Sequence, residues 1–424
     1  GSASADPDGT IVDYAWSSGG VPLTGAGGGG GGSTPPTTSN AVAGGTFDHL
    51  FESNQPDPAG VVPNSFGGAA APAGDVNGDG FDDVIIGAEV WDAGTEFAEG
   101  AAMVFLGGPA GPVGSNPDQA NALIVLNQAG ATVTDVASAG DVNGDGFADV
   151  IIGSHFYRST LPGTSLAVDG AAFVFHGGPN GITATGPAQA DAAIFSKHLI
   201  SGLGQTVASA GDVNGDGFDD VLVSVPREGT LFPPGIPPND RSGNYGAILL
   251  FHGGPAGITG TGFDDADAVI LPYEDTGQPL PPVDAGVGEA EGAGDINGDG
   301  FDDVIVGGTE ITIYLGGPTG IGAQDIFDAD ARIFGNPPLG VGGGIGGAGA
   351  RFRVAAAGDV NGDGFADVLA SLPGRALDPL TVPVAEGAVY LFLGSAAGVS
   401  ATSVDQADTT ILGSLSVESV GWTV

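Results

Sequence analysis

Five nine-residue acidic segments recur along the chain, and their side chains are the ones best suited to chemistry. Each reads D-[VI]-N-G-D-G-F-[DA]-D, and we number its residues as positions 1 to 9. The segments, here called acidic loops 1 to 5, are Asp75–Asp83, Asp141–Asp149, Asp212–Asp220, Asp295–Asp303 and Asp359–Asp367. Their starts lie 64 to 83 residues apart. A motif that returns at such spacing indicates a modular architecture.

Each acidic loop offers the oxygen ligands that a hard cation such as Ca²⁺ prefers. In loop 1, positions 1, 3 and 5 are Asp75, Asn77 and Asp79, which can point inward from a tight turn. Glycines at positions 4 and 6 allow the backbone to turn sharply where a β-carbon would clash. The position-9 carboxylate can close the shell, and the carbonyl of the position-7 phenylalanine can add a ligand. Without a cation between them, carboxylates this close together would repel one another strongly.

We therefore predict about five bound Ca²⁺ ions, one in each loop. The candidate metal ligands at positions 1, 3, 5, 7 and 9 are Asp75, Asn77, Asp79, Phe81, Asp83, Asp141, Asn143, Asp145, Phe147, Asp149, Asp212, Asn214, Asp216, Phe218, Asp220, Asp295, Asn297, Asp299, Phe301, Asp303, Asp359, Asn361, Asp363, Phe365 and Asp367.

Two other interpretations account for some features of the loops. An EF-hand needs a bidentate Glu at position 12, but that position holds Ile86, Ile152, Val223, Val306 or Ala370, so this interpretation fails. The loops could also be metal-free hairpin turns, because Asn, Asp and Gly favour turns in any case. Five copies that all keep the four side-chain ligands favour calcium.

Short apolar runs surround each loop and predict an all-β fold. An aliphatic run such as Val84-Ile85-Ile86 follows every loop, and short β-branched runs bounded by glycine are typical of buried strands. Further strands are expected at Ala101–Leu106, Asp191–Phe195 and Val136–Gly140, with equivalents in the other repeats. Four short antiparallel strands per repeat are typical of a blade of a β-propeller.

The repeat resembles the FG-GAP repeats of integrin α-subunit propellers. The resemblance rests on Phe66-Gly67, the following GDVNGDGFDD segment, the aliphatic strand and Gly87-Ala88, and it covers roughly residues 44–424. It implies Ca²⁺ ligands at positions 1, 3, 5, 7 and 9, as the loop chemistry also predicts. The final "GAP" degenerates in later repeats, for example to Gly153-Ser154, which leaves individual turns open but not the metal sites. Because related propellers have seven blades, we expect these five repeats to be part of a six- or seven-bladed ring.

The N-terminal region differs from the repeats. Residues 1–24 resemble part of a PKD-like, immunoglobulin-type β-sandwich, and a simple β arm is the alternative. Residues 25–43 are rich in Gly, Ser, Thr and Pro and form a predicted linker, and residues 44–424 form the predicted propeller. Phe47–Ser53 resembles the last strand of a blade and Val420–Val424 the first strand of another. Both ends look cut, so we expect missing blades in a longer precursor or strands from an adjacent molecule.

Composition limits the partners. The chain has eight Lys and Arg against 51 Asp and Glu, a net charge of −43, which argues against binding nucleic acid or anionic membranes through charge. It has no cysteine, so bound metals, rather than disulfides, are expected to stabilise it. Weak calcium sites stay filled in the millimolar calcium outside cells. We therefore expect a secreted or cell-surface protein that is not inserted in a membrane.

The alternation of strands places functional residues on two faces. In an up-and-down blade, the acidic loops lie on one face and the connections between the second and third strands lie on the other. On or near this second face we expect a group of basic and aromatic residues: Trp91, Phe97, His155, Phe156, Tyr157, Arg158, Lys197, Arg227, Phe232, Arg241, Tyr245, Arg351, Arg353 and Arg375. Such residues on loops favour recognition, but they could equally cap loops and pack insertions.

These observations leave three classes of function. The first is adhesion, or recognition of a protein or glycan, through the face opposite the acidic loops. The second is a structural subunit of a filament or surface layer, in which copies of the chain exchange strands. The third is an accessory domain of a larger extracellular enzyme. Within the chain itself, no arrangement of the five histidines resembles a catalytic triad or a zinc site, so no enzymatic activity is expected.

Overall fold

The computed structural model describes ten parts of the chain. They are residue 51 and residues 65–91, 98–160, 167–196, 202–225, 246–271, 289–322, 325–335, 351–373 and 387–413. The expectations for residues 1–43, for most of Phe47–Ser53 and for Val420–Val424 lie outside these residues. No helix in the described ranges is long and apolar enough to cross a membrane.

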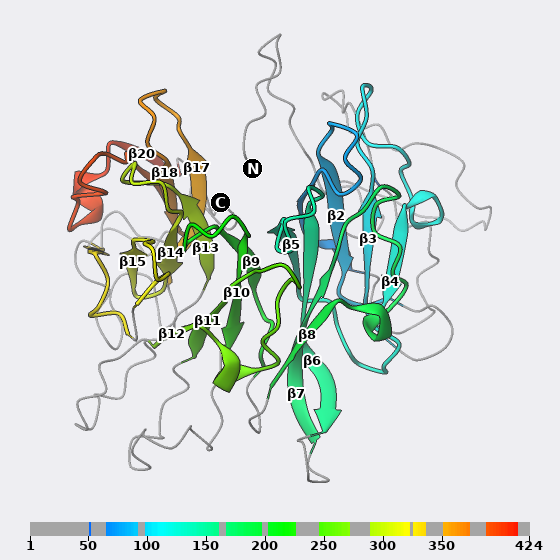
Figure 1. Cartoon of the computed structure of the whole chain (residues 1–424). Helices are drawn as coiled ribbons and strands as arrows, with labels where there is room; N and C mark the ends of the chain where they lie inside the picture. Colours follow the sequence, from blue (N-terminus) through cyan, green and yellow to red (C-terminus); the bar gives the residue numbers. More distant parts are fainter. Residues whose placement is uncertain are drawn as a thin grey trace, which may run out of the picture.

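Five four-stranded sheets form the blades of a β-propeller (Figure 1). Blade 1 consists of β1 (Phe66–Gly74), β2 (Asp83–Ala88), β3 (Ala101–Phe105) and β4 (Ala122–Val125). Blade 2 consists of β5 (Asp135–Gly140), β6 (Asp149–Thr160), β7 (Ala167–Phe175) and β8 (Ala192–Phe195). Blade 3 consists of β9 (Val207–Gly211), β10 (Asp220–Val225), β11 (Ala247–Phe251) and β12 (Ala268–Ile270). Blade 4 consists of β13 (Ala290–Gly294), β14 (Asp303–Gly307), β15 (Glu310–Tyr314) and β16 (Ala331–Phe334). Blade 5 consists of β17 (Arg353–Gly358), β18 (Asp367–Leu372), β19 (Ala388–Phe392) and β20 (Thr409–Leu412).

The strand order confirms the predicted blade. In every sheet the strands pair antiparallel in chain order. The predicted strands match the observed ones to within two residues except in blade 2, where β6 and β7 form a longer hairpin than predicted. The first strands lie innermost and pack on one another in succession, with β5 beside β1 and β9 and with β13 beside β9 and β17. Figure 1 shows β5, β9 and β13 near the middle of the molecule and β4 and β20 toward its periphery. Four short 3₁₀ segments, which the sequence did not predict, precede outer strands: Pro117–Gln119, Pro187–Gln189, Phe263–Asp265 and Val404–Gln406.

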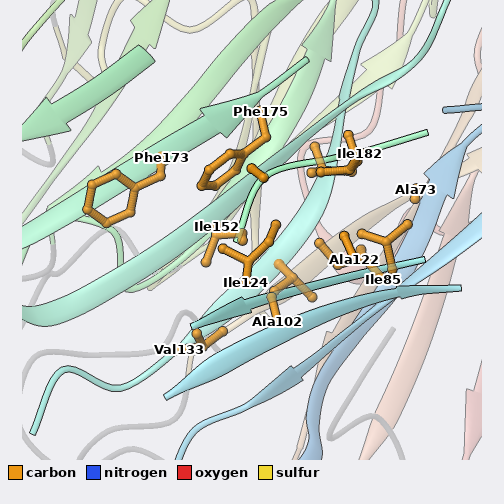
Figure 2. Close-up of a cluster of buried hydrophobic side chains, with 14 of the residues drawn as sticks. Ala73, Ile85, Ala102, Ala122, Ile124, Val133, Ile152, Phe173, Phe175 and Ile182 are labelled. Carbon is orange, nitrogen blue, oxygen red and sulfur yellow. The ribbon is translucent and has the colours of Figure 1, made fainter. Parts of the chain in front are cut away.

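Apolar cores fill the space between successive blades. Figure 2 shows the core between blades 1 and 2, where Ile85 and Ile124 of blade 1 meet Ile152 and Phe173 of blade 2. Equivalent cores join blade 2 to 3, blade 3 to 4 and blade 4 to 5. Burial of apolar surface between sheets therefore holds the blades in order.

Blade 5 exposes the face that the other blades bury. On blade 4, Ile296 and Ile333 are fully buried against blade 5. The equivalent residues of blade 5, Val360 and Ile411, are 53% and 57% exposed. At the other end, apolar side chains of blade 1 such as Ile86, Met103 and Phe105 form a buried cluster, and Phe51 packs on it with its ring 4.7 Å from the ring of Phe105. Completion of the ring by further blades stays a prediction.

Candidate metal centre

Each acidic loop connects the first and second strands of its blade. The position-9 aspartate is the first residue of the second strand, and a glycine that ends the first strand precedes position 1. The glycines at positions 4 and 6 have positive φ in all five loops, for example 71° at Gly78 and 88° at Gly80. A side chain at either position would strain the turn, so the sequence prediction for these glycines is confirmed.

Backbone amides organise the side-chain oxygens of each loop. In loop 1, the carboxylate of Asp75 accepts hydrogen bonds from the amides of Asp79 (3.0 Å) and Gly80 (2.8 Å). The side-chain oxygen of Asn77 also accepts from the Asp79 amide at 2.9 Å, and its side-chain nitrogen donates to the Asp79 carboxylate at 2.9 Å. The other four loops repeat these bonds to within 0.2 Å. The ligand candidates at positions 1, 3 and 5 are thus brought together in one fixed arrangement.

The position-9 aspartate anchors the loop from beneath. Asp149 is fully buried, and its two carboxylate oxygens accept from the amides of Val142 (3.0 Å) and Gly177 (2.8 Å). The equivalent aspartates Asp83, Asp220, Asp303 and Asp367 make the same pair of bonds. One side chain therefore ties the acidic loop to the turn that follows the third strand.

Burial and like charge act together on the position-9 carboxyl groups. The pKa of Asp149, Asp220 and Asp303 is raised to about 7, chiefly by burial; the two amide hydrogen bonds oppose the shift, and the carboxylates at positions 5 and 1 add to it. Burial also raises the pKa of Asp83. A buried carboxylate beside two others is costly to ionise unless a cation lies close to it. The donor set of carboxylates, an amide oxygen and a carbonyl fits a hard divalent ion.

The side chains do not converge on a single point. No group of three or more Asp, Glu or His side chains in the described ranges forms a ready coordination shell. The side-chain oxygens of each loop instead accept hydrogen bonds from backbone amides, those of the loop itself and, at position 9, that of the turn after the third strand. The ligand set therefore stays a prediction.

The position-7 phenylalanine has a second role that the sequence analysis missed. A β-carbon placed on Gly78 of loop 1 would lie 2.7 Å from the ring of Phe147, which comes from loop 2. The same contact joins Gly144 to Phe218, Gly215 to Phe301 and Gly298 to Phe365. Each phenylalanine thus packs its ring on the preceding loop, where only glycine leaves room. The repeated Gly and Phe were visible in the sequence, but their pairing crosses from one blade to the next.

Backbone hydrogen bonds continue this chain of loops. The amide at position 8 of each following loop donates to the position-1 carbonyl of the preceding one, as from Ala148 to Asp75 at 3.0 Å. The turn after the third strand of the following blade adds a bond to the position-2 carbonyl, as from Gly178 to Val76 at 2.9 Å. The acidic loops are therefore connected to one another along one face of the propeller.

The opposite face divides the predicted recognition residues into two groups. Trp91 is 3% exposed, Tyr157 packs on Phe173, and Arg353 forms an ion pair with Glu289 at 2.6 Å. These residues support packing, as the alternative interpretation expected. In contrast, Phe156 is 51% exposed and the side chain of Arg158 is 72% exposed. Seven candidates lie outside the described residues: Phe97, Lys197, Arg227, Phe232, Arg241, Tyr245 and Arg375.

A group of carboxyl groups on the inner strands was not predicted. Burial raises the pKa of Asp135 on β5 to about 7 and that of Glu291 on β13 to about 8, and their mutual repulsion adds to the shift of Glu291. The backbone amides of Val136 and Val207 donate to Asp135. Because these residues belong to different blades, no local pattern in the sequence could have placed them together.

Comparisons with known proteins agree with the repeat. The FG-GAP repeat family matches residues 66–102, 133–175, 203–250 and 352–392. These residues lie in blades 1, 2, 3 and 5, while blade 4 has the same strands outside the matched regions. The predicted FG-GAP resemblance is confirmed.

Integrin α chains are similar to part of this chain. Integrin alpha pat-2 of Caenorhabditis briggsae is 29% identical over 188 residues, which are 42% of this chain and 14% of the integrin. Integrin alpha-IIb of Mus musculus is 26% identical over 205 residues, 47% of this chain and 17% of the integrin. Integrin alpha-5 of Xenopus laevis is 29% identical over 191 residues, 43% of this chain and 15% of the integrin. The chain therefore spans only about a sixth of the length of these relatives.

Proposed function

We propose that this chain, which resembles the FG-GAP propellers of integrin α chains, is a calcium-loaded recognition module. In this proposal it works outside the cell or at its surface and binds a protein or glycan. Five loops with one conserved bonding pattern support the calcium part, because a structure built only of turns would not need four oxygen-bearing side chains in each copy. Calcium bound there would neutralise the clustered carboxylates and hold the ends of the first two strands of each blade together.

The binding part rests on the hairpin of β6 and β7. These strands continue beyond the blade, with Arg158 opposite Asp169 and Thr160 opposite Ala167, and Figure 1 shows their far ends projecting from the propeller. The side chain of Gln128 fixes the hairpin by bonding both the amide and the carbonyl of Arg158, at 2.6 and 3.0 Å. The hairpin thus presents Phe156 and Arg158 to solvent on a rigid support. Exposed aromatic and Arg side chains on such a support are suited to an interface.

We expect the double substitution Phe156→Ala and Arg158→Glu to weaken binding to the module's ligand at least tenfold, since interface anchors of this kind commonly contribute about 1–2 kcal/mol each. Binding would be measured on arrays of printed glycans and immobilised secreted proteins. The buffer would contain about 2 mM calcium, the order of magnitude found outside cells. A matched control is Phe327→Ala, because Phe327 is 52% exposed in the connection between β15 and β16, on the face of the acidic loops. Equal binding by the double variant and wild type would contradict the assignment of this face.

Self-assembly is the second candidate function, and the exposed face of blade 5 favours it. In blade 4 the apolar residues that face blade 5 are buried: Ile296, Ile305, Ile311, Ile313 and Ile333. The equivalent residues of blade 5 are half-buried or exposed: Val360, Leu369, Val389, Leu391 and Ile411. An apolar sheet face left open in this way invites another sheet. Sedimentation velocity over a range of protein concentrations distinguishes an assembling subunit from a monomeric recognition module.

A further inference from the structure

The residue at position 8 of each acidic loop is not one of the predicted metal ligands, yet it reaches the loop before its own. The position-8 residues are Asp82, Ala148, Asp219, Asp302 and Ala366. At all four junctions between described blades, the backbone amide of this residue donates to the position-1 carbonyl of the preceding loop, over 2.9 to 3.1 Å. The side chain differs, because two junctions carry Asp and two carry Ala.

Where the residue is Asp, its side chain adds a second bond. The carboxylate of Asp219 accepts from the amide of Asp141 at 2.6 Å, and that of Asp302 accepts from the amide of Asp212 at 2.9 Å. With the backbone bond, the position-1 aspartates of loops 2 and 3 are thus held at both their amide and their carbonyl by the next blade. At the junctions that carry Ala148 and Ala366, only the backbone bond is available from position 8.

Glycines make room for these carboxylates. Gly140 and Gly211 precede position 1 in loops 2 and 3, with φ of 76° and 71°. A β-carbon on either glycine would overlap the carboxylate of Asp219 or Asp302. The carboxylates are therefore seated directly against the backbone that leads into the neighbouring loop.

We propose that Asp219 and Asp302 are positioning residues that tighten calcium binding in the preceding loops, which divides the five sites into unequal classes. This inference rests on the proposed calcium binding of the loops. The carboxylate fixes the backbone of the position-1 ligand through a charge-assisted hydrogen bond. It also adds a negative charge beside the site, which attracts a cation. Both effects favour binding, and the hydrogen bond, which only the Asp141 and Asp212 amides make, causes loops 2 and 3 to bind calcium more tightly than loops 1 and 4. Loop 5 receives no such contact from the described residues, since no atom lies within 4 Å of a β-carbon placed on Gly358 or Gly362.

The test is a calcium titration of the full chain, with bound ions counted by native mass spectrometry at each free calcium concentration. Wild type should fill two sites first, and the double variant Asp219→Ala and Asp302→Ala should lose these two early steps, with a shift of about tenfold in each dissociation constant. The reciprocal variant Ala148→Asp should tighten one further site, that of loop 1. The variants Asp219→Asn and Asp302→Asn keep an acceptor oxygen and remove the charge, so they should fall between wild type and the alanine variants.

A second readout follows the hydrogen bond itself. In the double alanine variant, hydrogen exchange of the Asp141 and Asp212 amides should accelerate, while that of the Asp75 amide stays unchanged. Alanine already occupies this position at two junctions, so the alanine variants are expected to fold. If wild type binds no calcium, the proposed function fails as well. If wild type binds calcium and the alanine variants give the same titration curve, only the role of Asp219 and Asp302 is wrong.

Discussion

Chelation of calcium should lower the melting temperature of this protein by roughly 15 °C or more. A ligand that binds only the folded state at a hundredfold excess over its dissociation constant stabilises that state by about 2.7 kcal/mol per site. Five such sites would together contribute on the order of 13 kcal/mol, as much as the whole stability of many domains. In a chain of this size, each kcal/mol corresponds to roughly 1–2 °C, somewhat less than in domains of 150–250 residues. Differential scanning calorimetry with calcium and with EGTA measures the shift.

The acidic loops are connected to one another, so they should respond to the removal of calcium together. Each loop contacts the next through the Phe ring, the position-8 amide and the turn after the third strand, and loss of calcium should therefore loosen several blades at once. Calorimetry should show one broadened transition at lower temperature rather than the loss of a single small unit. Excess calcium added after EGTA is the control and should restore the original melting curve. A melting temperature that is the same in calcium and EGTA would contradict the proposed role of the loops.

Replacement of a position-9 aspartate should be the most damaging single substitution in the acidic loops. We expect Asp149→Ala to lower the free energy of unfolding by about 3–5 kcal/mol, because it leaves the buried amides of Val142 and Gly177 without their acceptors and also removes a metal ligand. Urea denaturation in saturating calcium measures this loss. Asp149→Asn keeps an acceptor oxygen, so in EGTA it should be less harmful than alanine.

A surface aspartate provides the matched control for this substitution. Asp118 is exposed, lies in a 3₁₀ segment and belongs to no acidic loop. Asp118→Ala should change the free energy of unfolding by less than about 0.5–1 kcal/mol, as is usual for surface positions. If Asp149→Ala unfolded at the same urea concentration as Asp118→Ala, the anchoring role of the buried carboxylate would be wrong.

The blade could be predicted from sequence because its signals are local. Each acidic loop marks a turn between two strands, and runs such as Val84-Ile85-Ile86 mark the strand that follows it. Strand pairing then follows chain order within each blade, so no long-range pairing had to be inferred. The 3₁₀ segments were missed because short polar stretches such as Pro117–Gln119 carry no apolar periodicity.

Contacts of individual side chains, within a blade or between blades, could not be predicted in the same way. Whether Tyr157 faces a ligand or packs on Phe173 depends on the path of a neighbouring strand, and the composition of its loop gives no indication of that path. The same is true of Arg353, which lies beside Glu289 of the preceding blade, and of Asp219, which reaches back to loop 2. Arg353 and Asp219 act across junctions between residues that are 64 and 78 positions apart in the chain, a distance over which sequence patterns carry no directional information.

If the acidic loops hold divalent ions, the purified chain must carry them in a defined number. Equilibrium dialysis against about 1 mM calcium, the level at which extracellular sites are filled, followed by elemental analysis, counts the bound ions. The proposed calcium binding predicts about five ions per chain. It predicts about four for the variant Asp145→Ala, which lacks one position-5 carboxylate. A wild-type chain that retained less than one calcium ion under these conditions would contradict calcium binding by the loops.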